Sequence, residues 1–205
     1  MDMLSLRFDG HTHVLHSLDM AEVSLDRPRV ALPDGAELDE FGVVWRGGAP
    51  VNAPVPGRAA LEGYRFPAPQ EEFLRERMET LDRAEDGRLR VCTLHTPLLS
   101  RAEALAGRGA LRRSMTEDPD FAHALLLGVC GQTLAVMETA MQFSLDALCL
   151  TEDWTLPPEL WRGFVRPCLA RLYAMVKAYG RPVIQRGGGA FLPELEALGL
   201  DVLWE

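Results

Sequence analysis

The sequence predicts an α/β fold, a partial or truncated (β/α)8 TIM-barrel-like fold, and two observations lead to it. The 205 residues are 47% hydrophobic and 25% charged, which is enough for the core of a single domain over residues 1–205. From Phe143 to Glu205 the pattern runs strand, acidic corner, long helix, strand, glycine-rich loop, helix and strand. Eight-stranded barrels typically take about 250 residues, so the chain fits only part of one.

The N-terminal half is less regular, and its elements rest on local patterns. We expect strands at Met3–Phe8 and Phe41–Trp45, joined by a connection rich in proline and acidic residues. Residues Pro67–Arg83 carry spaced apolar residues among many charges, which predicts an exposed amphipathic helix. The alternation in Arg88–His95 predicts a buried strand, and a helix over Pro97–Gly107 follows it.

The C-terminal half carries clearer start and stop signals. Pro119 suits a first helical turn and Asp118 suits its cap, which predicts a long helix over Asp118–Met141. Pro158 similarly opens a helix that Gly180 closes. The expected strands of this half are Leu145–Leu150, Pro182–Ile184 and Asp201–Trp204.

Charge and cysteine usage exclude several classes of protein. A net charge of -9 argues against nucleic-acid binding, which needs clustered basic residues. The four cysteines are widely spaced in apolar runs, so we expect reduced core residues without a disulfide framework or a structural zinc site. No apolar run approaches the roughly 18 to 20 residues of a membrane helix, and Met1–Asp9 is unlike a signal peptide. We therefore expect a cytoplasmic protein without a membrane segment.

Two loops follow predicted strands and are the places to look for chemistry, because active sites of parallel barrels lie on such loops. The first is Thr151–Trp154, and the second is Gln185–Gly189 with its three glycines. Glu152 and Asp153 could serve as carboxylates or as a helix-capping loop. The glycines could hold an anion by backbone N–H groups or form a turn.

The order and spacing of several segments resemble the uroporphyrinogen decarboxylase superfamily, which also holds methylcobamide-dependent methyltransferases. The segments are Asp39–Arg46, Tyr64–Pro67, Met115–Pro119, Glu152–Trp154, Pro158–Trp161 and Arg166–Pro167. The resemblance implies a (β/α)8 barrel and, for the decarboxylases, removal of carboxylates from a tetrapyrrole without a cofactor.

The resemblance also implies roles for individual residues. Decarboxylation needs an acid, arginines that position the acetates and a carboxylate that faces the pyrrole N–H groups. The implied catalytic residues are Asp153, Glu152 and Glu103, the last at a position where the decarboxylases carry a tyrosine. The implied substrate-binding residues are Arg186, Arg101, Gly187, Gly188 and Trp154.

Three alternatives stay open. The first is corrinoid-dependent methyl transfer, but the H-x-C-G metal motif of those relatives is replaced by Gln185 and Gly187, which are not zinc ligands. The second is a metal-dependent amidohydrolase, in which His11 and His13 form an H-x-H motif with His95 and Asp153 as further ligands. The third is a non-catalytic paralogue or subunit.

An open parallel sheet that ends in Asp201–Trp204 would expose an edge strand. We therefore expect self-association or a partner chain. The expected ligand is a small tetrapyrrole or corrinoid-like molecule, and no metal or cofactor is assigned.

Overall fold

The computed structural model describes residues 3–8, 11–16, 20–83 and 87–204, and describes the first two of these segments by their backbone alone. Its main element is a seven-stranded sheet in the order β2-β1-β11-β10-β9-β8-β3. The strands are β1 (Met3–Phe8), β2 (His11–His16), β3 (Met20–Ser24), β8 (Leu89–His95), β9 (Ala147–Thr151), β10 (Val183–Arg186) and β11 (Val202–Trp204).

Strands β3, β8, β9, β10 and β11 are neighbours and run parallel, as the sequence predicts for a partial barrel. The β1–β2 hairpin adds to β11 in the antiparallel direction. The expectation that β11 forms an exposed edge is therefore wrong, because β1 covers it and the edges of the sheet are β2 and β3. The strand pattern of β11 could not reveal this, because its partner comes from the other end of the chain.

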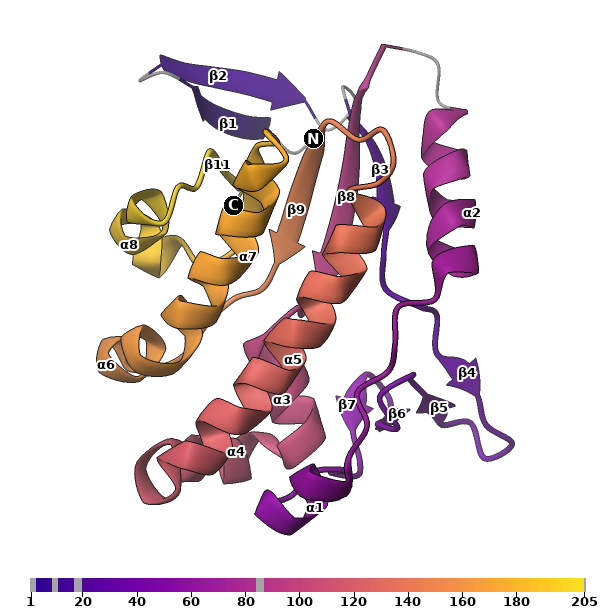
Figure 1. Ribbon diagram of the computed structural model, residues 1–205, viewed down its shortest axis with the longest axis vertical. Coiled ribbons are helices and arrows are strands. Elements are labelled where there is room, and N and C mark those ends of the chain that lie inside the picture. Colours follow the sequence, from indigo (N-terminus) through magenta and orange to yellow (C-terminus); the bar gives the residue numbers. More distant parts are fainter. Residues whose placement is uncertain (1–2, 9–10, 17–19, 84–86, 205) are drawn as a thin grey trace.

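The helices lie mainly between the parallel strands in sequence. They are α1 (Arg58–Gly63), α2 (Glu71–Asp82), α3 (Leu99–Ala106), α4 (Arg108–Glu117), α5 (Pro119–Ala140), α6 (Pro158–Leu160), α7 (Arg166–Ala178) and α8 (Leu192–Ala197). A π-helical turn at Trp161–Val165 joins α6 to α7, and a 3-10 turn at Gly189–Phe191 precedes α8. Figure 1 shows α5 and α7 side by side over one face of the parallel sheet.

A second, smaller sheet stands apart at one end of the molecule (Figure 1). It is an antiparallel meander of β4 (Val30–Ala31), β5 (Glu37–Leu38), β6 (Val44–Arg46) and β7 (Ala49–Pro50). The sequence pattern indicated only the strand near Phe41–Trp45. The other strands have two residues each, too few for an alternating pattern to be recognised.

The parallel sheet is buried on both faces, which is typical of α/β folds. Alternate residues of its strands face the helices, where Cys92, Leu148 and Val183 join the main core. The residues between them face the opposite side and form a second cluster of Met20, Val91, Ala147, Cys149, Ile184, Val202 and Trp204. All four cysteines are free and buried, as expected from their spacing.

Helix α5 corrects one sequence expectation. Its 22 residues are long and apolar enough, by length and hydropathy, to span a membrane, although no such segment was expected. Half of the qualifying window is buried inside the protein, where α5 packs against α2, α3, α4 and α7. Its start is as predicted, because the Asp118 side chain accepts a hydrogen bond from the Phe121 N–H and Pro119 occupies the first turn.

Candidate functional site

The second face of the parallel sheet changes from apolar to polar toward the carboxyl ends of its strands. The last paired row of this face is His95, Thr151, Arg186 and Trp204, on four neighbouring strands. Asp26 follows the end of β3 and joins this row by contacting His95. The carboxyl ends of parallel strands are where α/β folds bind ligands, so this row is the candidate site.

His95 and Asp26 form a hydrogen-bonded pair. The Nδ1 atom of His95 lies 3.2 Å from Asp26 Oδ2, and the same oxygen accepts the His95 backbone N–H at 2.7 Å. This hydrogen bond raises the pKa of His95 above its usual value. Because Nδ1 is occupied, Nε2 is the nitrogen left to exchange a proton with a ligand. The imidazole is 47% exposed and therefore reachable.

Arg186 lies above the ring of Trp204, with its guanidinium carbon 3.4 Å from the ring centroid. It also contacts Glu22 at 3.3 Å, and the other oxygen of Glu22 accepts the Thr93 hydroxyl at 2.5 Å. Glu22 is on β3 and Arg186 on β10, three strand spacings away, which is roughly 14 Å in a flat sheet. The face is therefore concave, as in part of a barrel.

Arg101 reaches the site from α3 and connects it to the small sheet. It donates to Asp39 at 2.8 Å, lies 3.9 Å from Asp26, and stacks 4.2 Å above the ring of Phe41. Asp39 is buried and also accepts from the Phe41 and Val43 N–H groups and from the Trp45 indole. The arginine is therefore held in a fixed position.

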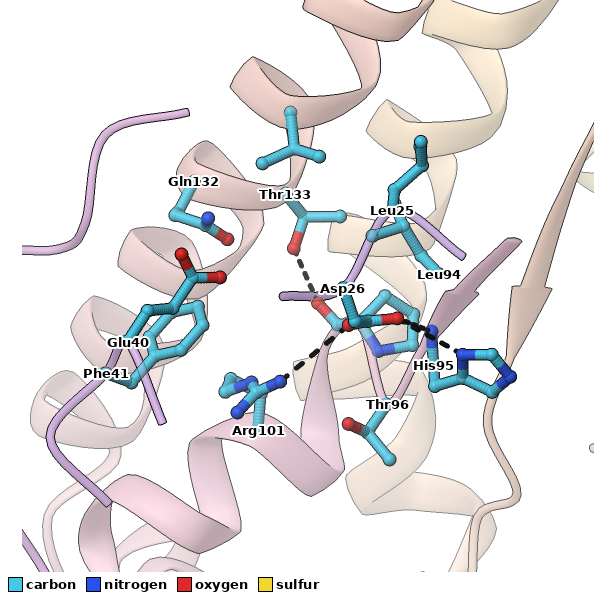
Figure 2. A pocket seen from close by; sticks show the side chains of 12 residues that line it. Leu25, Asp26, Glu40, Phe41, Leu94, His95, Thr96, Arg101, Gln132 and Thr133 are labelled. Carbon is cyan, nitrogen blue, oxygen red and sulfur yellow. Dashed lines mark hydrogen bonds and ion pairs between the residues drawn. The ribbon is translucent and has the colours of Figure 1, made fainter. Parts of the chain in front are cut away.

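A cavity lies beside Asp26, His95 and Arg101, and Figure 2 shows these side chains with Glu40 around it. The centres of water-sized groups can occupy about 20 Å³ of it. A single water needs roughly 10 to 15 Å³ on this measure, so the cavity admits the tip of a substrate arm and not a ring. Thr96 and Arg101 line both this cavity and a neighbouring one of about 250 Å³ that includes Trp45.

Thr96 itself is held in an unusual conformation. Its φ is +51°, in the left-handed region that β-branched residues seldom adopt. Its N–H donates to Thr151 O at 2.8 Å, directly after β8. Strained residues of this kind gather at binding and catalytic sites, which supports the location of the site.

Of the catalytic residues implied by the resemblance, Glu152 lies inside the protein. Its Oε1 accepts the Ser100 N–H at 2.5 Å, at the start of α3, and its Oε2 accepts the Trp154 indole N–H at 3.1 Å. Burial raises the pKa of this carboxyl, and the hydrogen bonds oppose that effect. Trp154 is also buried, against Trp161 and Phe191. Both side chains hold parts of the fold together, and neither of them lines the cavity beside His95.

Asp153 and the glycine loop contact each other. The Oδ1 atom of Asp153 accepts the Gly188 N–H at 3.2 Å and the Trp154 N–H at 3.0 Å. Gly187 and Gly188 have φ values of +85° and +79°, and a Cβ on Gly188 would lie 2.3 Å from the Trp154 ring. Glycine is thus required here for close packing of two loops. A role for Asp153, Gly187 and Gly188 in substrate binding stays a prediction.

Glu103 lines the larger neighbouring cavity, and its charge is matched by arginines. It accepts from Arg112 at 2.7 Å and lies 3.6 Å from Arg108. Its side chain is 13% exposed. The position implied by the resemblance is therefore near the site, but its carboxylate is already paired.

The metal-binding alternatives can be compared with these positions. Gln185 is fully buried, accepts from the Tyr173 hydroxyl and donates to Glu152 O, so it does not face the site. The side chains of His11 and His13 lie outside the described residues, and β1, β11, β10 and β9 separate their strand from that of His95. Among the side chains described, no group of three or more His, Cys, Asp or Glu could hold a metal ion.

Sequence reasoning did not identify Asp26, Glu22 or Glu40. A signal was present in Met20–Ser24, where apolar and polar residues alternate and an acidic residue follows two positions later. Because several prolines lie nearby, the sequence pattern predicted an irregular connection here and no strand.

Two known proteins are similar to this chain in sequence or in fold. Over 93 residues the chain is 33% identical to a uroporphyrinogen decarboxylase from Rhodococcus erythropolis, a match that covers 43% of this chain and 26% of that protein. The structure matches a methyltransferase from Methanosarcina mazei with a TM-score of 0.64 and 14% identity, over 76% of this chain and 48% of that one. No family model matches the chain.

The fold is thus an α/β fold with a parallel sheet that matches part of a TIM-barrel protein. Part of the chain is thus similar in sequence to a uroporphyrinogen decarboxylase. The match spans about a quarter of the length of that relative.

Proposed function

We propose that this chain binds a tetrapyrrole-like carboxylate at the carboxyl ends of its parallel strands and decarboxylates it without a cofactor. The observation that carries the proposal is the Asp26–His95 pair, with Arg101 lying 3.9 Å from Asp26 and Arg186 in the same row of strand ends as His95. The homology to a uroporphyrinogen decarboxylase supports the substrate class.

The chemistry assigned to these residues is limited. A carboxylate leaves as CO₂, its bonding electrons pass into a protonated pyrrole ring, and the remaining carbon takes up a proton. The Nε2 atom of His95 supplies that proton, the ring releases its own proton to solvent, and Asp26 holds the imidazole in position. Arg186 and Arg101 stabilise the negative charge of the acid groups.

A non-catalytic binding role is the second candidate, and one observation favours it. Both arginines already have carboxylate partners, since Arg101 contacts Asp39 and Arg186 contacts Glu22. A substrate carboxylate would have to compete with them. Such a protein would bind the tetrapyrrole without releasing CO₂.

The test is binding of uroporphyrin and of cobalamin, followed by tryptophan fluorescence. Trp204 is the best reporter, because Arg186 stacks on its ring at the candidate site, whereas Trp154 and Trp161 lie in the main core. We expect His95→Gln to abolish CO₂ release, whereas His123→Gln leaves it unchanged, because His123 stacks on Phe164 away from the site. Uroporphyrin binding without CO₂ release would establish the binding role instead.

Binding of cobalamin alone would contradict the proposal and favour corrinoid chemistry. Metal content of the native protein gives an independent check. About one equivalent of zinc would instead favour the metal-dependent amidohydrolase hypothesis, with His95 among the zinc ligands.

A further inference from the structure

A second cavity lies beside the candidate site, between the small sheet and α3, and the proposed reaction does not use it. It offers about 250 Å³ to the centres of water-sized groups, and Thr96 and Arg101 line both cavities. An apolar cavity of roughly 150 Å³ holds benzene. The second cavity therefore has room for one ring with a short substituent, but not for the four linked rings of a tetrapyrrole.

One wall of this cavity is a fixed aromatic surface. Trp45 and Pro50 lie directly opposite each other on β6 and β7, so their side chains share one face of the small sheet, and both line the cavity. The indole N–H of Trp45 donates to Asp39 at 2.9 Å, and the guanidinium carbon of Arg29 lies 3.8 Å from the ring centroid. Ala104 lines the cavity from α3. An apolar surface held in this way suits the packing of an aromatic ring.

The charges at this cavity leave one cation over. Arg101 donates to the buried Asp39 at 2.8 Å, and Arg112 donates to Glu103 at 2.7 Å, so these charges are neutralised in pairs. Arg108 also lines the cavity but lies 3.6 Å from Glu103, too far for a hydrogen bond. No other ion pair of Arg108 is found in the described part of the chain, and its side chain is 64% exposed. Arg108 is therefore the cation that can meet an anionic group of a ligand.

We propose that this cavity binds a small aromatic acid with a single ring. The ring packs against Trp45, Pro50 and Ala104, and the carboxylate meets Arg108 at the solvent-exposed side of the cavity. This inference does not rest on the proposed function, because the cavity is too small for a tetrapyrrole and its ring-packing residues are separate from the Asp26–His95 pair. It can therefore be tested whether or not uroporphyrin binds.

The first test is binding of 4-fluorobenzoate to the full chain, followed by ¹⁹F NMR, with 4-fluorobenzyl alcohol as an uncharged ligand that carries the same ring. We expect saturable binding of both ligands. Arg108→Gln should weaken binding of the acid roughly fivefold, the factor for one unit charge about 4 Å away in water, and leave the alcohol unchanged. Arg113→Gln is the matched control, because Arg113 is exposed on α4 and does not line the cavity. It should change neither affinity.

A second variant tests the aromatic wall. Trp45→Leu should weaken binding of the acid and of the alcohol alike, by about fivefold, because both rings lose the indole. If Trp45→Leu does not fold, Ala104→Val replaces it and should weaken both ligands by filling part of the cavity. The proposal is overturned if wild type shows no saturable binding of 4-fluorobenzoate at millimolar concentration. It is also overturned if Arg113→Gln weakens the acid as much as Arg108→Gln, or if the wall variants leave both affinities unchanged.

Discussion

At the scale of single residues, the loop Gln185–Gly189 resembles an anion-binding loop in sequence, but packing against Trp154 explains why it carries Gly188. Gly188 has φ +79°, and the ring of Trp154 fills the space that a side chain would need. We expect Gly188→Ala to lower the free energy of unfolding by about 2 kcal/mol or more, through a strained backbone and a clash with the ring. Gly131→Ala in α5 is the control, because nothing lies near its Cβ position and alanine should stabilise the helix. Denaturant unfolding of both variants measures the difference, and equal stabilities would count against this packing.

His95 gives a pH dependence with a definite sign. Its folded-state pKa is raised by the hydrogen bond to Asp26, so the pair stabilises the fold fully below pH about 6.5 and loses this contribution as pH rises through the folded pKa. The melting temperature of His95→Gln should therefore lie further below wild type at pH 5.5 than at pH 8.5. The imidazole is 47% exposed, so the contribution should stay below about 1 kcal/mol. A difference that grows at high pH would contradict the pairing.

At the scale of elements, Glu152 connects the end of β9 to the start of α3. Glu152→Ala would leave the half-buried Ser100 N–H and the buried Trp154 indole N–H without their acceptor. We expect a loss of about 3 kcal/mol in the free energy of unfolding. Glu159→Ala, at an exposed position in the first turn of α6, should change stability by no more than about 0.5 kcal/mol. Thermal and urea unfolding report both, and a mild effect of Glu152→Ala would refute the structural role.

At the scale of the whole molecule, the sheet is an open half-barrel with β2 and β3 at its edges. Exposed strand edges favour pairing with another chain, so self-association stays our prediction, now assigned to these strands. Light scattering coupled to size-exclusion chromatography should give a mass above the 22.7 kDa of one chain. A monomer that persists at millimolar concentration would contradict it.

Part of this molecule follows from local sequence. Capping and proline signals determined α5, and alternation determined β8, because those signals act within one element. The order and spacing of short segments indicated the similarity to a uroporphyrinogen decarboxylase that the comparison found over 93 residues. The helix over Pro158–Tyr179 was also expected, although its π-helical turn was not.

The site itself was decided by the tertiary structure. Glu152 and Trp154 look like loop residues in sequence, but contacts with the start of α3 and with Phe191 bury them. Asp26, His95 and Arg186 come from three separated segments, and only the curvature of the sheet brings them to one edge. A sequence records which residues alternate along each strand. Which strands are neighbours, and which carboxylates find partners, depends on contacts between residues far apart in the chain.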